Sequence, residues 1–315
     1  MNQKTTVDWL RFRTQADVPE GLEALRGMFG DRGARLNLAH LPRGRDGWQQ
    51  AAELRLGEWR MGDVCFGGES QRGVVRWNLS GEGCENVLDW DAAAELEALP
   101  KARITRLDLA LTTWEGEIGH HAVEAAHGVG LFGCGGPMPN MRRILNSDPT
   151  KGETIYVGER GSDKFFRSYE KGWELLAKMG SAARAKRVCG TPEVTLIDGC
   201  PAEDIYRCEL ELKAKEHELP WETIERRDQY FGGAYPFLAE LVPGVEADIL
   251  RRRPERAPQT ALSAVLANCR LQYGAAIFTA LTAYHGDITR VFEQICGKEL
   301  HEGMLAAGVL EVDHE

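Results

Sequence analysis

The stretch TIYVGERGSDKFFRSYEK, residues 154–171, is the part of this sequence that decides the fold around it. It reads as a β-hairpin. Side chains alternate along a strand, so the second strand of the hairpin places Arg167, Tyr169 and Lys171 on one face. A tyrosine between two cations is poorly suited to a hydrophobic core. The pattern instead predicts a phenol that attacks or holds a phosphate.

Two other segments predict strands with one polar face each. Residues 104–111 (ITRLDLAL) alternate apolar and polar positions, with Asp108 on the polar side. Residues 206–213 (YRCELELK) alternate in the same way and place four charged side chains on one face: Arg207, Glu209, Glu211 and Lys213. In one sheet, side by side, the three strands would form a cluster of hard oxygen ligands beside a nucleophile.

The bulk composition is that of an ordinary soluble globular protein, with 43% hydrophobic and 27% charged residues in 315. No apolar run approaches the length that spans a bilayer, and the N-terminal residues carry charges where a signal peptide has its apolar stretch. We therefore expect a cytoplasmic protein and no membrane. None of the eight cysteines forms a C-x-x-C pair, so a structural zinc is not expected.

The charges are unevenly distributed. The formal net charge of −10 argues against a nonspecific nucleic-acid binder. Between residues 140 and 190, however, eleven Lys or Arg stand against six Asp or Glu. A second basic group consists of Arg251, Arg252, Arg253 and Arg256. Such local charge suits a protein that holds a polyanion at one place, and a solvated basic loop fits it equally well.

The remaining segments predict an α+β fold with a largely antiparallel central sheet, flanking helices and a C-terminal helical region. The expected elements are a strand at 7–14, a hairpin of 61–67 with 73–81, a helix at 89–99 with Asp89 as N-cap, a helix around 120–127, a loop at 128–151, a helix at 173–187, and helices from 259 to about 305. A proline- and arginine-rich stretch predicts two domains, 1–245 with the candidate site and 246–315 as the helical region.

The candidate site residues indicate a function only when they are considered together. Carboxylates such as Asp108, Glu209 and Glu211 are more often salt-bridge partners than metal ligands. Together with Tyr169 they supply what phosphoryl transfer needs, because Mg²⁺ or Mn²⁺ takes oxygen ligands and polarises a phosphate oxygen. A phenol with a pKa of about 10 needs nearby positive charge or a base to act near neutrality.

Four blocks of the sequence resemble, in order and spacing, the replication initiation factor family, which includes rolling-circle initiators of filamentous phages and staphylococcal-type plasmids. The blocks are ITRLDLALTTWEGE (104–117), TIYVGERGSDKFFRSYEKG (154–172), YRCELELKAKEHELPWETI (206–224) and RDQYFGGAYPFL (227–238). The resemblance covers roughly residues 5 to 290. It implies a metal-dependent enzyme that nicks a replication origin through a tyrosine and becomes linked to the DNA 5′ end as a phosphotyrosine, leaving a 3′-hydroxyl for the host polymerase.

The family's functional positions fall on particular residues here. The nucleophilic tyrosine falls on Tyr169, and the acidic positions that would hold Mg²⁺ or Mn²⁺ fall on Asp108, Glu209 and Glu211. The family commonly has a second aspartate where this chain has Thr112, so the metal could be bound weakly or could recruit Glu115. The residues expected to neutralise phosphate charge or to bind DNA are Arg106, Arg142, Arg143, Arg160, Lys164, Arg167 and Lys171.

The sequence shows no nucleotide-binding P-loop, so a host helicase is an expected partner, with a homodimer possible and the cytoplasm of a bacterial host as the location. Two other functions stay open. A non-catalytic origin- or operator-binding regulator could retain the fold without the chemistry, and a metal-dependent nuclease could use water in place of the tyrosine.

Overall fold

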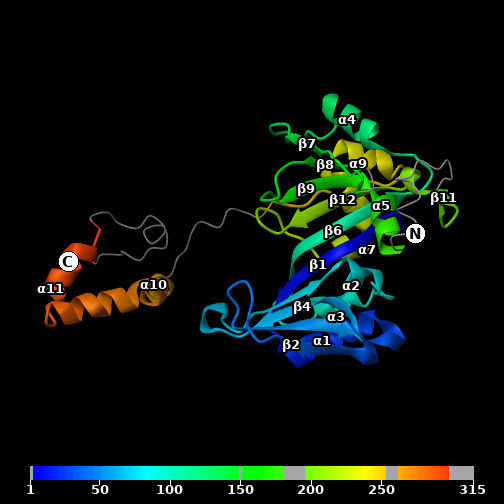
Figure 1. Ribbon diagram of the computed structural model, residues 1–315. Helices are drawn as coiled ribbons and strands as arrows, with labels where there is room; N and C mark the ends of the chain where they lie inside the picture. Colours follow the sequence, from blue (N-terminus) through cyan, green and yellow to red (C-terminus); the bar gives the residue numbers. More distant parts are fainter. Residues whose placement is uncertain (1–2, 149–150, 180–195, 253–261, 298–315) are drawn as a thin grey trace. The chain divides into compact units, whose positions relative to one another are not determined.

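The computed structural model describes residues 3–148, 151–179, 196–252 and 262–297. The chain divides into two compact units, Met1–Arg252 and Arg253–Glu315. Cys189, Arg253, Arg256 and the part of the expected helix after Met179 lie outside the described residues. Unit 1 is built on one large sheet with helices packed against it (Figure 1).

The sheet of unit 1 has ten strands, and each strand is antiparallel to its neighbours. In spatial order they are β2 (Leu36–His40), β3 (Gln50–Leu56), β4 (Trp59–Phe66), β5 (Val75–Leu79), β1 (Thr6–Thr14), β6 (Arg103–Thr113), β12 (Tyr206–Lys213), β9 (Lys164–Glu170), β8 (Thr154–Val157) and β7 (Met141–Ile144). The α+β fold with a largely antiparallel sheet is thus confirmed. The three expected polar strands lie next to one another, with β12 between β6 and β9.

Short helices connect the strands or cover the sheet. They are α1 (Val18–Met28), α2 (Gly81–Glu85), α3 (Ala93–Glu97), α4 (His120–Gly128), α5 (Lys171–Met179), α7 (Glu222–Glu225), α8 (Arg227–Ala234) and α9 (Pro236–Leu241). Short 3₁₀ turns at Gly30–Arg35, Glu69–Gln71 and Ala202–Asp204 and a small β10–β11 pair (Leu196–Ile197, Cys200–Pro201) complete the described part of unit 1.

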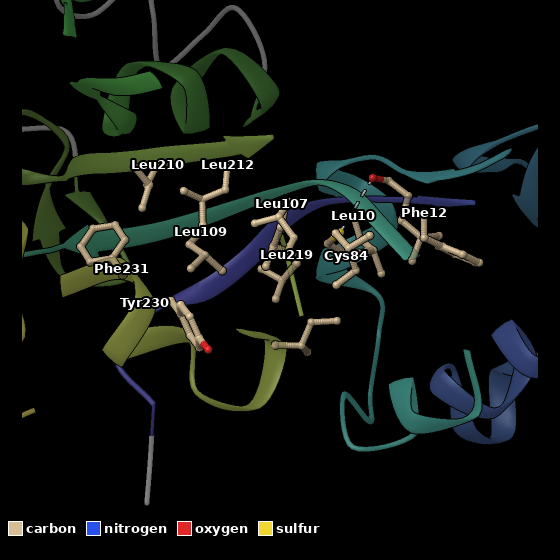
Figure 2. Packing of buried hydrophobic residues seen from close by; sticks show 14 of the residues in the cluster. Leu10, Phe12, Cys84, Leu107, Leu109, Leu210, Leu212, Leu219, Tyr230 and Phe231 are labelled. Carbon is tan, nitrogen blue, oxygen red and sulfur yellow. Dashed lines mark hydrogen bonds between the residues drawn. The ribbon is translucent and has the colours of Figure 1, made fainter. Parts of the chain in front are cut away.

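One face of the central strands forms the core. Leu107 and Leu109 of β6 and Leu210 and Leu212 of β12 are all fully buried, and they pack in one cluster with residues of the segment that carries α7 and α8 (Figure 2). The period-2 pattern explains this, because every second side chain of a strand points to the same face. Each such leucine contributes about 1.5–3 kcal/mol of burial free energy. The polar residues between them must therefore occupy the opposite face.

Three expectations about local structure were wrong. Residues 141–144, within the expected loop, form the edge strand β7. The helix expected at 89–99 is only Ala93–Glu97, and Asp89 lies in a turn before it, where its carboxylate accepts the N–H groups of Asp91 and Ala92. The sequence reading also missed α1, β2 and β3, although Asp17 caps α1 by accepting the Glu20 N–H.

Unit 2 contains α10 (Leu262–Ala283) and α11 (Ile288–Ile295), and Asp287 caps α11 by accepting the Arg290 N–H. Residues 246–252, expected in the C-terminal region, belong to unit 1, where the Glu218 N–H donates to the carbonyl of Arg251. Whether 1–245 and 246–315 are separate functional domains stays a prediction. Among the described helices, none combines the length and the apolar character that crossing a membrane requires.

Candidate active site

The register of β6, β12 and β9 gathers the expected site residues on one face. Asp108 lies opposite Glu211, Glu209 opposite Arg167, and Arg207 opposite Tyr169. Directly paired residues of an antiparallel sheet point to the same side, and this is the side away from the buried leucines. The structure therefore brings the tyrosine, its arginine and all three carboxylates together.

Tyr169 is held by a carboxylate. Its hydroxyl donates a hydrogen bond of 2.6 Å to Oε1 of Glu209, and its ring is half-buried on the face of the acids. Burial, and next the Glu209 charge, raise the pKa of Tyr169 well above its usual range. The phenol is therefore protonated at rest, with its proton already directed at an acceptor.

Cations surround the same tyrosine. The Arg167 guanidinium carbon lies 5.4 Å from the centre of the Tyr169 ring, and Lys171 Nζ lies 5.9 Å from it. Lys171 was expected on the strand, but β9 ends at Glu170 and Lys171 begins α5. The chain turns at Gly172, where a Cβ would lie 1.8 Å from the carbonyl oxygen of Ala202. Lys171 still reaches the ring, and it also pairs with Glu174 at 2.8 Å.

Glu209 is the centre of a network that the sequence did not reveal. Its side chain is almost fully buried, Oε2 accepts from Arg167 Nε at 2.7 Å, and Oε1 lies 3.2 Å from Arg207 Nε. Arg207 in turn pairs at 2.5 Å with Asp8 of β1. Burial raises the pKa of Asp8, an effect that Arg207 opposes. Asp8 was not among the expected site residues, although it lies in the strand expected at 7–14, because no catalytic or metal-binding role was assigned to that strand.

The position of Thr112, where the family commonly has a second aspartate, is beside this network. Thr112 lies opposite Arg207 on β12, and Arg207 contacts Asp8. Glu115, the expected substitute, is exposed beyond the end of β6. The carboxylate that reaches this end of the site is therefore Asp8.

Asp108 and Glu211 share an arginine. Arg106 Nη2 lies 2.5 Å from Oδ2 of Asp108 and 2.9 Å from Oε2 of Glu211, and Lys213 also pairs with Glu211. The Arg106 guanidinium stacks on the ring of Trp9, 4.8 Å from its centroid. Asp108 is 3% exposed, and burial raises its pKa to about 6 against the opposing effect of Arg106.

Two hollows adjoin these residues. A pocket of about 40 Å³ is lined by all three carboxylates together with Phe165 and three arginines: Arg106, Arg160 and Arg167. A wider, open hollow of about 470 Å³ reaches Tyr169 from the side of α5, where Lys151 and Trp173 contribute to its walls. The Tyr169 side chain therefore borders a space large enough for part of a nucleotide.

A divalent cation fits the donor chemistry of the smaller pocket, although no ready-made site is present. Among the described residues, no three acidic, His or Cys side chains are arranged to hold a metal ion. The carboxylates of Asp108, Glu209 and Glu211 line one pocket, but arginines occupy their oxygens. The neighbouring carboxylates add to the raised pKa of Asp108, a repulsion that a cation would relieve.

The expected DNA-binding residues are dispersed. Arg160 lies over the rings of Tyr156 and Phe165 and lines the small pocket, whereas Lys164 donates to the carbonyl of Ala234. Arg142 is in register with Tyr156 and Arg167 on the site's face and pairs with the exposed Glu159.

Arg143 has the opposite orientation. Its register partners are Ile155 and Ser168, and its guanidinium pairs with Glu124 of α4 and with Glu153. DNA contact by Arg143 and by the other expected residues stays a prediction.

Part of this chain is similar to proteins that are already known. Residues 102–248, the segment with β6, β9 and β12, match the model of a family described as replication initiation factor. A rolling circle replication initiator protein from Geobacillus stearothermophilus is similar in structure, with a TM-score of 0.52 and 18% identity, over 83% of this chain and 90% of that one. No curated protein sequence matches.

The structural likeness, at this identity, shows the fold. The family match covers the strands that carry the tyrosine and the acids, so the resemblance to the replication initiation factor family is confirmed over residues 102–248.

Proposed function

We propose that the protein is a rolling-circle replication initiator that recognises an origin and nicks one strand through Tyr169. The observation that carries this is the 2.6 Å hydrogen bond from the Tyr169 hydroxyl to the buried Glu209, within the family segment and beside an open hollow. A tyrosyl nucleophile stores the cleaved bond as a phosphodiester, so the strand can later be rejoined.

The proposed step is an attack of the tyrosine on the scissile phosphodiester. The Tyr169 oxygen attacks the phosphorus of the scissile phosphodiester while its proton passes to Oε1 of Glu209. The bond between phosphorus and the 3′ oxygen breaks, and that oxygen takes a proton to leave as a 3′-hydroxyl. The 5′ phosphate remains on Tyr169, and rejoining is the reverse reaction. Arg167 and Lys171 neutralise charge on the phosphate.

Glu209 has a second role in this proposal, in addition to the metal binding expected from the sequence. Because the pKa of Tyr169 is raised, its cations do not ionise it at rest, and a base must take the proton during attack. Glu209 is the acceptor within reach.

A divalent cation belongs to the proposal as well. Mg²⁺ or Mn²⁺ would be held by Asp108 with Glu211 and Glu209, and it would polarise a phosphate oxygen. Arg106 would then leave Asp108 and become available for the DNA phosphate.

Replacement of Tyr169 by phenylalanine tests the nucleophile. The probe is the supercoiled replicon that encodes the chain, incubated with Mg²⁺ or with a chelator. We expect the wild type to relax this DNA and to retain a covalent protein–DNA adduct after denaturation, and Tyr169→Phe to bind it without forming an adduct, because no other atom replaces the lost oxygen.

Each other outcome contradicts the proposal in its own way. Cutting without an adduct by the wild type indicates a nuclease that uses water. Binding without cutting indicates a regulator. An adduct formed by Tyr169→Phe indicates another nucleophile, with Tyr156→Phe as the matched control. A host helicase as partner, a homodimer and the bacterial cytoplasm remain part of this proposal.

A further inference from the structure

A row of arginines crosses the sheet on the site's face, on strands β5, β1 and β6, and of these arginines only Arg106 was expected to bind DNA. In the register, Arg11 of β1 lies opposite Arg106 of β6, and Arg13 lies opposite both Arg103 of β6 and Arg76 of β5. Opposed side chains have their Cβ atoms only about 4.5–5.5 Å apart, and like charges in such pairs destabilise a sheet.

Two of these arginines are neutralised within the protein. Arg76 pairs with Asp46 at 2.8 Å, and Arg106 pairs with Asp108 and Glu211. For Arg11, Arg13 and Arg103, no ion-pair partner is found among the residues that the structure describes. The nearby Asp63 pairs with Arg60.

The three remaining arginines have no carboxylate in direct contact among the described residues, although Asp63 and Asp46 act on Arg11 from a distance. Nε of Arg11 donates to the neutral side chain of Asn78 at 3.2 Å, and Nε of Arg13 is buried with no hydrogen-bond partner in the described part of the chain. Burial, and next the neighbouring arginines, lower the pKa of both. Arg103 is exposed. A protein of net charge −10 thus concentrates unpaired positive charge where anions could relieve it.

We propose that Arg11, Arg13 and Arg103 form a track that binds the sugar–phosphate backbone of the DNA strand entering the active site. This inference rests on the proposed function, since it assigns the path of that function's substrate. Trp9 supports this inference. It pairs in the sheet with Asp108, between the track and the acids, and its Nε1 is buried without a partner among the described residues. Basic grooves with aromatic side chains are typical of single-strand binding.

The position of the track sets the length of DNA involved. Thr112 of β6 and Tyr169 of β9 both pair with Arg207 of β12, so they lie at the same height in the sheet. Arg106 and Arg103 lie six and nine residues from Thr112 along β6. These separations are about 20 and 30 Å at about 3.3 Å per residue. At the stacked spacing of about 3.4 Å per nucleotide, the track would contact phosphates up to about nine nucleotides from the cleaved bond, and fewer nucleotides away where the strand is more extended.

The test is the salt dependence of binding to a single-stranded oligonucleotide of about 20 nucleotides, for which each neutralised phosphate contributes about 0.7 to the slope of log K against log salt. The double variant Arg11→Gln/Arg13→Gln should lower this slope by about 1.4, and Arg103→Gln by about 0.7. The control Arg35→Gln, an exposed arginine of the 3₁₀ turn Gly30–Arg35, should leave it unchanged.

The variants should melt at or above the temperature of the wild type without DNA, because a like-charge opposition is removed. If the double variant fails to fold by circular dichroism, Arg103→Gln carries the test alone, since its side chain is exposed. Unchanged slopes, or slopes altered on duplex DNA only, would overturn the track.

Formation of the covalent adduct is scored separately in the same preparations. An adduct with unchanged slopes leaves the nicking function standing and removes the track. Reduced slopes without any adduct by the wild type leave the track standing and remove the nicking function.

Discussion

Burial is the main influence on the pKa values of the two most informative residues of the site, Tyr169 and Asp108. Both pKa values are raised, with burial as the largest cause in each case. From the sequence, the cations beside Tyr169 would be expected to favour its ionised form. The structure shows Glu209 at the hydroxyl, and a buried carboxylate in direct contact disfavours a second negative charge.

Asp108 should make stability depend on pH. Its folded pKa of about 6 exceeds the ordinary value of 3.8 for an aspartate, so the folded state holds this proton more tightly. The resulting stabilisation is fully present below about pH 4 and is lost as the pH rises through about 6, a change of about 3 kcal/mol. Asp108→Asn should abolish this change, which urea unfolding from about pH 4 to about pH 8 without divalent ions would measure.

Asp17→Asn is a suitable control for that measurement, because this exposed aspartate caps α1 through the Glu20 N–H and does not line the carboxylate pocket. Parallel stability curves for the wild type and Asp108→Asn would show that the Asp108 pKa is not raised.

At the level of elements, the junction of β9 and α5 shows how a backbone contact sets a functional position. The sequence placed Lys171 on the strand, since alternation continues through it. Gly172 N–H donates to the carbonyl of Ile205 and its Cα approaches Ala202, so the chain turns into a helix one residue earlier. Periodicity describes single strands and does not include such contacts.

Gly172→Ala should therefore disturb this junction. Its Cβ would meet the Ala202 backbone at 1.8 Å, so we expect a loss of about 1–3 kcal/mol in unfolding free energy. The start of α5 and Lys171 should move away from the Tyr169 ring, with a slower adduct formation. Gly161→Ala, in the turn between β8 and β9 with open space around its Cβ, is the matched control. Equal stability of the two variants would refute this account.

At the scale of the whole molecule, the central strands of the sheet in unit 1 differ from its edge strands in burial and in the number of neighbouring strands. The central strands β1, β6 and β12 have buried leucines on one face and the site on the other, whereas β2 and β7 are edge strands with one neighbour each. A site on central strands is held more rigidly than one on loops.

Amide hydrogen exchange should follow this order. We expect the slowest exchange in β6 and β12 and the fastest in β7 and β2, because edge strands open with a smaller free energy than the core. Mass spectrometry of peptides from each strand, after hydrogen exchange of the full chain, measures these exchange rates. Equal protection in β7 and β12 would contradict this order.

The sequence by itself determined the strands within 104–111, 154–170 and 206–213, the polar face of each, and the resemblance of residues 102–248 to the replication initiation factor family. These features are local, since alternation and motif order need no knowledge of distant residues. Only the tertiary structure decided that β12 separates β6 from β9, that Glu209 meets the Tyr169 hydroxyl, and that β1 brings Asp8, Arg11 and Arg13 to the face of the site. These depend on pairing and register between strands far apart in the chain, which alternation within one strand leaves open.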